Sequence, residues 1–93
     1  MVASSTPGHP LGVRSTAEAN AYLPAFGLAV RQRREQLGYS QEQFAFEAEL
    51  DRTYVSGIER GIRNPTLKTM IRLCKVLKTQ PSTLLKDAEK LAK

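Results

Sequence analysis

Four polar or basic residues stand close together near the middle of this chain of 93 residues: Arg52, Thr53, Tyr54 and Ser56. The guanidinium of Arg52 can donate two hydrogen bonds to one planar partner, and guanine presents such a partner through O6 and N7. Thr53 can contact a thymine methyl or a phosphate, and the Tyr54 hydroxyl can reach a phosphate backbone. The chemistry open to this group is hydrogen-bonded recognition, provided that one exposed helix carries it.

Two short helices joined by a tight turn are predicted to position these residues. Ser40 followed by Gln43 resembles a capping box that starts the first helix at about Gln41, and Asp51 can cap the second. The second helix should run to residue 60 and end at Gly61. Each helix buries one stripe if its apolar and small residues face inward, namely Phe44, Ala45, Ala48, Leu50, Val55 and Ile58. This spacing is typical of a helix-turn-helix, whose second helix enters the major groove of DNA.

Three further helices are expected around this pair. The first spans roughly 24–37, with Pro24 in its first turn and Gly38 as its stop. Thr66 can cap the next, whose apolar face includes Cys74, which we expect in the core. A last helix begins at Thr79 and tolerates an early proline. The predicted fold class is all-α, a compact five-helix domain.

The chain is predicted to consist of a tail and one domain. Residues 1–16 mix prolines and glycines with serines and threonines, show no periodicity, and are expected to be flexible. Residues 17–93 form the domain, with its core at 24–86. Residues 16–23 could add one helical turn before the first long helix.

Composition and charge limit the possible functions. Lysine and arginine number 14 against 9 aspartates and glutamates, so the formal net charge is +5. A basic domain is attracted to polyanions such as nucleic acid, although many small basic domains bind none. No apolar run reaches the roughly 18 residues of a membrane span. No signal-peptide core is present either, so we expect a cytoplasmic, nucleoid-associated protein.

Neither catalysis nor a cofactor is predicted. The single cysteine cannot form an internal disulfide, and with one distant histidine, His9, it cannot complete a zinc site. The sequence suggests no serine, histidine and carboxylate set, no phosphate-binding glycine loop and no metal-ligand cluster. We therefore expect a binding protein and not an enzyme.

Two segments of the predicted helix-turn-helix resemble a known family. Gly38-Tyr-Ser-Gln-Glu-Gln-Phe-Ala is followed by Leu50-Asp-Arg-Thr-Tyr-Val-Ser-Gly-Ile-Glu-Arg-Gly-Ile-Arg-Asn-Pro-Thr-Leu. Together they are similar to the Xre-type helix-turn-helix family, which includes the lambdoid phage repressors and Cro proteins. The string from residue 50 to 60 looks closest to the controller proteins of restriction–modification systems. The resemblance covers about 24–86 and implies a lambda-repressor-like DNA-binding domain.

The resemblance also implies roles for residues outside the recognition group. Gln41 corresponds to a glutamine that contacts a phosphate at the helix start, and the alternative is a solvated side chain. Arg34 and Glu59 correspond to a partly buried ion pair that ties the first helix to the third. Glu49 stands where the family usually has glycine in a left-handed conformation, which costs a non-glycine residue about 1–2 kcal/mol.

Several of these residues have a second, purely structural interpretation. Arg52 could be an ordinary surface arginine beside Asp51, and the Tyr54 ring could pack on the preceding helix. Gly57 either lets the helix approach the bases or only weakens it, by about 1 kcal/mol. Basic and polar residues at the end of the helix and in the next loop are expected to clamp phosphates, unless they form a solvated face: Arg60, Arg63 and Asn64.

A single recognition helix covers only about four or five base pairs, so a two-fold dimer is expected, reading half-sites about 34 Å apart. The apolar side of the last helix is the predicted dimer interface: Leu84, Leu85, Ala88 and Leu91. Alternatively, Leu84 and Leu85 only close the monomer core.

The function predicted from these observations is a sequence-specific, dimeric transcriptional regulator of double-stranded DNA, acting as a repressor or as activator and repressor in turn. Two alternatives remain open. One is an antitoxin that binds its operator and grips a toxin through residues 1–16 or the last helix. The other is a protein-interaction adapter that has lost DNA reading.

Overall fold

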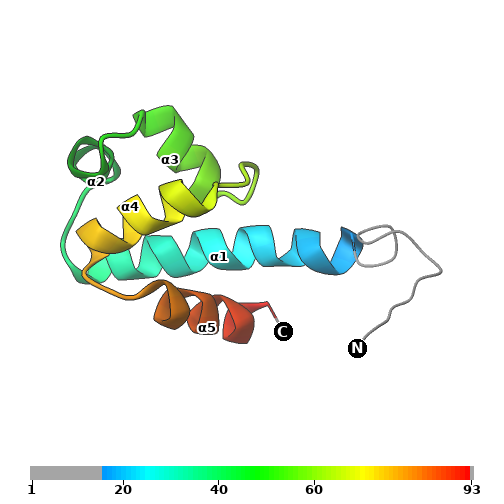
Figure 1. The fold of residues 1–93 in the computed structure, drawn as a ribbon. Coiled ribbons are helices and arrows are strands. Elements are labelled where there is room, and N and C mark those ends of the chain that lie inside the picture. Colours follow the sequence, from blue (N-terminus) through cyan, green and yellow to red (C-terminus); the bar gives the residue numbers. More distant parts are fainter. Residues whose placement is uncertain (1–15, 93) are drawn as a thin grey trace.

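Five α-helices make up most of residues 16–92, the part of the chain that the computed structural model describes, with side chains from residue 19 onward (Figure 1). No strand occurs within this part, which confirms the all-α prediction. The helices are α1 (Thr16–Gln36), α2 (Gln41–Ala48), α3 (Arg52–Glu59), α4 (Leu67–Leu77) and α5 (Pro81–Leu91). The predicted tail lies outside the described residues, His9 included, except for Thr16.

Helix α1 is longer than predicted, because it begins at Thr16 and continues through Pro24. Proline inside a helix removes one backbone hydrogen bond and costs about 3 kcal/mol. The preceding residues are rich in alanine, the best helix former, which favours helix on the N-terminal side of the proline. The prediction that the helix starts at Pro24 is therefore wrong. In Figure 1 the first turns of α1 extend beyond the other four helices.

Side-chain caps begin two of the helices as predicted. The Ser40 hydroxyl accepts a hydrogen bond from the backbone N–H of Gln43 at 3.0 Å, at the start of α2. Thr66 does the same for Thr69 at 3.1 Å, at the start of α4. Each bond satisfies one of the amide donors that a helix start leaves free.

Two other predicted starts need correction. Asp51 occupies the N-cap position of α3, but its side chain makes no capping bond and instead accepts from the Thr53 hydroxyl at 2.7 Å. A carboxylate oxygen held by a nearby hydroxyl is turned away from the backbone amides that it could cap. Helix α5 starts at Pro81 with Gln80 as its N-cap, so Thr79 is not its first residue.

Two helices end on non-glycine residues in the left-handed conformation. Glu49 ends α2 with φ 58°, as the family resemblance implies, and Lys78 ends α4 with φ 55°, which was not predicted. The guanidinium of Arg33 on α1 donates to the carbonyl oxygens of Leu77 and Lys78, at 2.9 and 3.1 Å. Arg33 thus satisfies carbonyls that the end of α4 leaves free.

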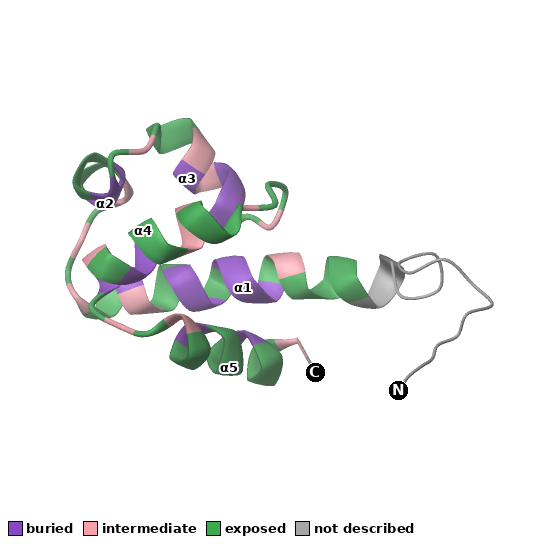
Figure 2. Ribbon diagram, viewed as in Figure 1, coloured by how far each residue is buried: buried purple, intermediate pink, exposed green. Residues whose placement is uncertain are grey.

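Buried residues lie on all five helices (Figure 2), and α1 packs against α3, α4 and α5 while α2 packs against α3 and α4. The largest fully buried members of the core are Phe44, Ile58, Leu73, Leu77, Leu84, Val30 and Val55, and Cys74 is buried with them. At one point α1 and α3 meet backbone to backbone. A Cβ built on Gly27 would lie 2.2 Å from the carbonyl oxygen of Ile58, so only glycine fits there.

Two of the four residues of the predicted dimer interface on α5 are buried within the monomer. Helix α5 runs alongside α1 in the opposite direction (Figure 1), and Leu84 and Ala88 are buried in the monomer core. They lie four residues apart and so share the inward side of the helix. Leu85 and Leu91 are 44% and 36% exposed, and only these two can meet another molecule. None of the described helices is long and apolar enough to cross a membrane.

Candidate nucleic-acid interface

Helix α3 has one buried side and one exposed side, which fixes what it presents to a partner. Val55 and Ile58 are buried in the core, and Glu59 is buried against α1. Arg52, Thr53 and Arg60 are exposed and Ser56 is half-buried. Ser56 lies four residues after Arg52, three after Thr53 and four before Arg60, so the four residues share one face of the helix. We call them the α3 outer face. The sequence predicted all four as DNA contacts, and the structure brings them together.

Among the residues whose side chains are described, none forms a hydrogen bond or an ion pair with the Arg52 side chain in the first turn of α3. The Asp51 carboxylate accepts a hydrogen bond from Thr53, and no ion pair joins it to Arg52 in residues 19–92. The guanidinium of Arg52 is therefore available to an outside acceptor. Its neighbour Tyr54 is half-buried and packs against the hydrophobic core, as the structural interpretation of this residue proposed.

The end of α3 carries the remaining predicted contacts. Arg60 donates a hydrogen bond to the Ser56 hydroxyl at 3.3 Å, one turn back along the helix. Arg63 and Asn64 are exposed in the loop before α4. This loop folds back on α3, because the backbone N–H groups of Ile62 and Arg63 both donate to the carbonyl of Gly57. The loop residues therefore lie next to the recognition helix.

Gly57 does not fit the first interpretation that the sequence suggested, in which it lets the helix approach the bases. It is buried, so it does not face an incoming base, and the Arg63 side chain covers it. A Cβ at residue 57 would lie 2.4 Å from Cγ of Arg63. The sequence could not predict this contact, because it depends on the path of the loop.

A buried ion pair holds the C-terminal end of α3 against α1. The Arg34 side chain donates to both carboxylate oxygens of Glu59, from Nε to Oε2 at 2.7 Å and from Nη2 to Oε1 at 3.0 Å. The side chains of Arg34 and Glu59 are only 10% and 3% exposed. A third donor bond, from Nη1, reaches the carbonyl of Tyr39 at 2.8 Å. The bond to Glu59 raises the pKa of Arg34, against the opposing effect of burial, so the charge is permanent.

Gln41 extends this network to α2. Its amide nitrogen donates to Oε1 of Glu59 at 3.0 Å, so one carboxylate connects α1, α2 and α3. Gln41 is half-buried at the first residue of α2, where free backbone amides favour an anion. The sequence predicted a phosphate contact or a solvated side chain for Gln41 and did not suggest that Glu59 holds its side chain.

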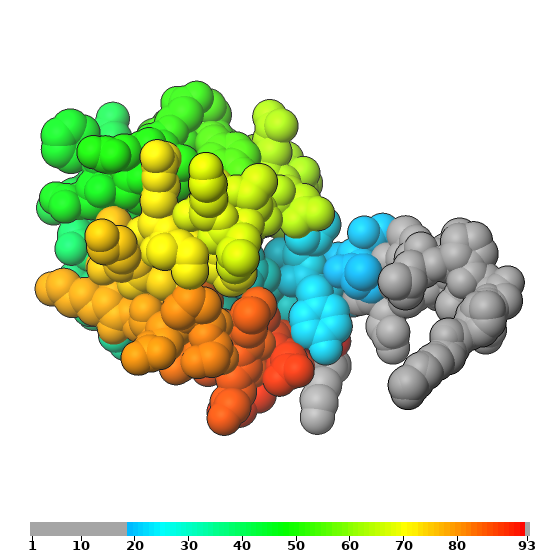
Figure 3. All heavy atoms as spheres, viewed as in Figure 1, coloured from blue at the N-terminus to red at the C-terminus, as the bar shows by residue number. Residues whose placement is uncertain are grey.

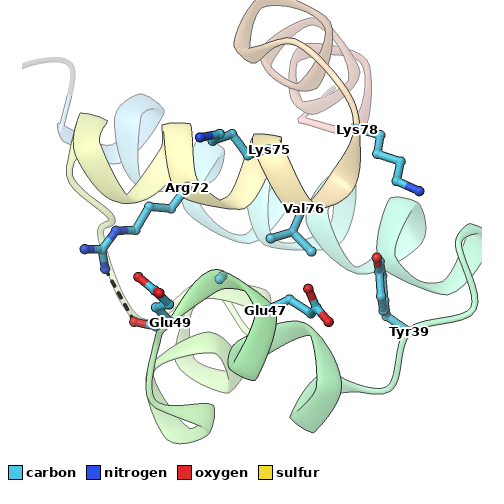
Figure 4. A pocket seen from close by; sticks show the side chains of 8 residues that line it. Tyr39, Glu47, Glu49, Arg72, Lys75, Val76 and Lys78 are labelled. Carbon is cyan, nitrogen blue, oxygen red and sulfur yellow. Dashed lines mark hydrogen bonds between the residues drawn. The ribbon is translucent and has the colours of Figure 1, made fainter.

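An open groove of about 500 Å³ between α2 and α4 was not predicted (Figure 4). One wall carries Glu47 and Glu49 of the helix-turn-helix, and the other carries Arg72, Lys75 and Lys78. Arg72 donates to the backbone carbonyl of Glu49 at 3.4 Å, which connects α4 to the left-handed turn residue. Among the described residues, no three histidines, cysteines or carboxylates are grouped closely enough to hold a metal ion.

Comparison with known proteins gives a consistent result. The Helix-turn-helix family model, HTH_3, matches residues 30–84. The control protein C.BamHI of Bacillus amyloliquefaciens is 49% identical over 61 residues, which cover 64% of this chain and 75% of that protein. The crystal structure of the restriction-modification controller protein C.AhdI from Aeromonas hydrophila matches with a TM-score of 0.67 and 44% identity. That match covers 69% of this chain and 97% of C.AhdI.

A further solved structure includes nucleic acid. The controller protein C.Esp1396I, crystallised as a tetramer with its natural 35 base-pair operator, matches with a TM-score of 0.69 and 32% identity. The match covers 76% of this chain and 93% of that protein.

Proposed function

This chain belongs to the Helix-turn-helix family, and we propose that it is a sequence-specific transcriptional regulator that occupies a two-fold DNA operator as a dimer. The observation that carries the proposal is the α3 outer face, which presents Arg52, Thr53, Ser56 and Arg60 on one short helix. Behind this face, the buried pair of Arg34 and Glu59 fixes the helix to α1. A helix held in this way can enter a major groove without losing its orientation.

The residues of the site have two different roles, base reading and phosphate binding. Arg52 reads a base, because its guanidinium is unengaged at the start of α3, and Thr53 and Tyr54 assist at the adjacent base or backbone. Backbone phosphates are bound by the amide end of α2 and by the polar groups that surround α3, namely Gln41, Ser56, Arg60, Arg63 and Asn64. The activity is binding, with no chemical step and no cofactor. The protein works on the chromosome, in the cytoplasmic nucleoid.

The dimer surface that the structure supports differs from the one on α5 alone. Leu67 and Ile71 of α4 are 68% and 43% exposed and share one side of that helix, and Leu85 of α5 is 44% exposed. Helices α4 and α5 lie side by side on the face seen in Figure 3. Leu85 also lines an apolar groove of about 200 Å³, whose other lining residues come from α1, the loop before α4, α4 and α5: Tyr22, Leu23, Phe26, Asn64, Pro65, Met70 and Ala88. We propose that the second copy packs on this face of α4 and α5.

The dimer surface can be tested by sedimentation. Ile71→Asp and Leu85→Asp should each convert a dimer to a monomer, because a carboxylate would have to be buried at the interface. Leu28→Asp is the matched control, since Leu28 is 40% exposed on α1 and does not line the groove. An unchanged mass in both test variants would rule out this dimer surface but would not bear on the proposal that the protein binds DNA.

Selection of bound sites from random duplex DNA tests the main proposal. The wild type should enrich a two-fold site with half-sites about one helical turn apart. Arg52→Ala should cost about 1–3 kcal/mol of specific binding and relax one base position. Lys90→Ala, which removes one exposed charge on α5, should keep the wild-type preference. Failure of the wild type to enrich any site would refute the proposal, and equal losses on specific and random DNA would make Arg52 a phosphate contact only.

The alternatives gain no support from the relatives, which are named as control proteins. An antitoxin that gripped its toxin through residues 1–16 would use a segment almost wholly outside the described residues. An adapter that had lost DNA reading would have no use for the unengaged Arg52.

A further inference from the structure

Gly57 occupies an unexpected place for a glycine, in the last turn of α3, as the sixth of its eight residues. In a helix interior, glycine is less favourable than alanine by about 1 kcal/mol. The residue lies one turn after Thr53, at the edge of the α3 outer face, on the side where the loop from α3 to α4 returns. The helix therefore gives up stability at a position beside its reading face.

The loop between α3 and α4 contacts Gly57 through its backbone and through the side chain of Arg63. The carbonyl of Gly57 accepts hydrogen bonds from the backbone N–H groups of Ile62, at 2.9 Å, and Arg63, at 3.2 Å. The stem of Arg63 then crosses the position where a side chain of residue 57 would be. A Cβ there would lie 2.4 Å from Cγ, 3.4 Å from Nε and 3.5 Å from Cβ of Arg63.

We propose that Gly57 is a positioning residue for Arg63. The missing side chain leaves a seat on α3 for the aliphatic stem of the arginine, and the exposed guanidinium is thereby delivered to a backbone phosphate beside the reading face. The inference rests on the proposed DNA-binding function. It adds the reason why a glycine stands in the recognition helix.

Replacing Gly57 by alanine should remove the contact with the Arg63 stem while leaving the fold intact. Gly57→Ala leaves the carbonyl and both loop hydrogen bonds available, and it improves helix propensity, so the protein should still fold. The 2.4 Å contact cannot persist, however, and because Cγ lies near the backbone the arginine stem must rotate away. A guanidinium that has left the seat no longer faces the same phosphate.

The test measures binding to the selected operator between about 50 and 200 mM salt for the wild type, Gly57→Ala, Arg63→Ala and the double variant. Each subunit of the dimer loses one phosphate contact, so two contacts per operator lower the logarithmic salt slope by about 1.8, and each variant should lose about 12-fold less affinity than the wild type over this range. The double variant should match Arg63→Ala, because alanine at 63 has no Cγ to displace. Gly57→Ala should melt at or above the wild-type temperature.

Three outcomes would overturn the inference. The first is a wild-type salt slope in Gly57→Ala, and the second is full additivity of the two single losses. The third needs no DNA: proton NMR of the wild type should show cross-relaxation between the Gly57 Hα and Arg63 Hγ protons, and its absence means that no seat exists. A wild type that binds no operator would instead refute the proposed function, a result distinct from a binding wild type with an unaffected Gly57→Ala variant.

Discussion

Replacing Glu59 by glutamine should destabilise the fold far more than the similar shape of the two side chains suggests. The Glu59 carboxylate accepts three hydrogen bonds, two from Arg34 and one from Gln41, at 2.7, 3.0 and 3.0 Å. Glutamine keeps one acceptor oxygen and replaces the other with an NH2 group. One donor then faces another donor, and the Arg34 guanidinium, 10% exposed, loses its counter-charge.

The size of the expected loss in folding stability follows from the burial of this ion pair. Removing one partner of a buried ion pair costs about 3–5 kcal/mol, and the remaining amide oxygen places Glu59→Gln near the lower end, about 3 kcal/mol. In a domain of this size, 1 kcal/mol shifts the melting temperature by about 4–8 °C. The melting temperature of Glu59→Gln should therefore fall by about 12–24 °C.

Thermal and urea unfolding, followed by circular dichroism, measure this loss. Glu35→Gln is the matched control, because it breaks an exposed ion pair. The side chains of that pair, Arg31 and Glu35, are 59% and 53% exposed. Exposed pairs within a helix contribute about 0.3–0.5 kcal/mol, so the control should change little. The double variant Arg34→Met with Glu59→Leu should recover most of the stability, because neither charge is then buried. A Glu59→Gln loss no larger than that of Glu35→Gln would refute the reasoning.

Three further predictions concern the packing of the helices and the conformation of the turn. Gly27→Ala should cost about 3 kcal/mol in urea unfolding, because its Cβ would lie 2.2 Å from the backbone oxygen of Ile58 and neither backbone can yield easily. Glu49→Gly should raise stability by about 0.5–1 kcal/mol, since relief of the left-handed strain exceeds the added chain entropy of glycine. Burial raises the pKa of the Cys74 thiol, so thiol reagents should label it only as fast as the protein opens. Stability should then decline as the pH rises above about 8.5, where cysteine ionises in the unfolded chain but not in the core. Rapid labelling of the native protein, or a flat stability profile from pH 8 to 10, would contradict the burial.

The features predicted correctly from the sequence depend on residues close together in the chain. Ser40 and Thr66 bond to amides three residues away, and a helix start needs no more than that. Spacing within eight residues likewise decides which side of α3 is apolar. These signals were sufficient for five helices and for the candidate recognition residues on one face.

The features that the sequence missed depend on which helices meet. The α5 side chains Leu84 and Ala88 looked available to a partner, and only their packing in the monomer core removes them from the surface. Gly27 and Gly57 carry no sequence signal for what fills the space beside them, which is backbone of α3 in one case and the stem of Arg63 in the other. The hydroxyl of Thr53 competes for the Asp51 carboxylate in a way that residue preferences at helix caps do not reveal.

The supports of α3 explain how so short a helix can act as a rigid reading element. Eight residues are too few for a stable isolated helix in water, so its conformation and angle must come from contacts. Those contacts are of three kinds: the backbone of α1 at Gly27, the ion pair of Glu59 with Arg34 of α1, and the loop that bonds to Gly57. The proposed reading residues Arg52 and Thr53 belong to none of these supports. Operator preference can therefore change through the exposed first turn at little cost in stability, whereas changes at the supports alter the angle of the whole helix.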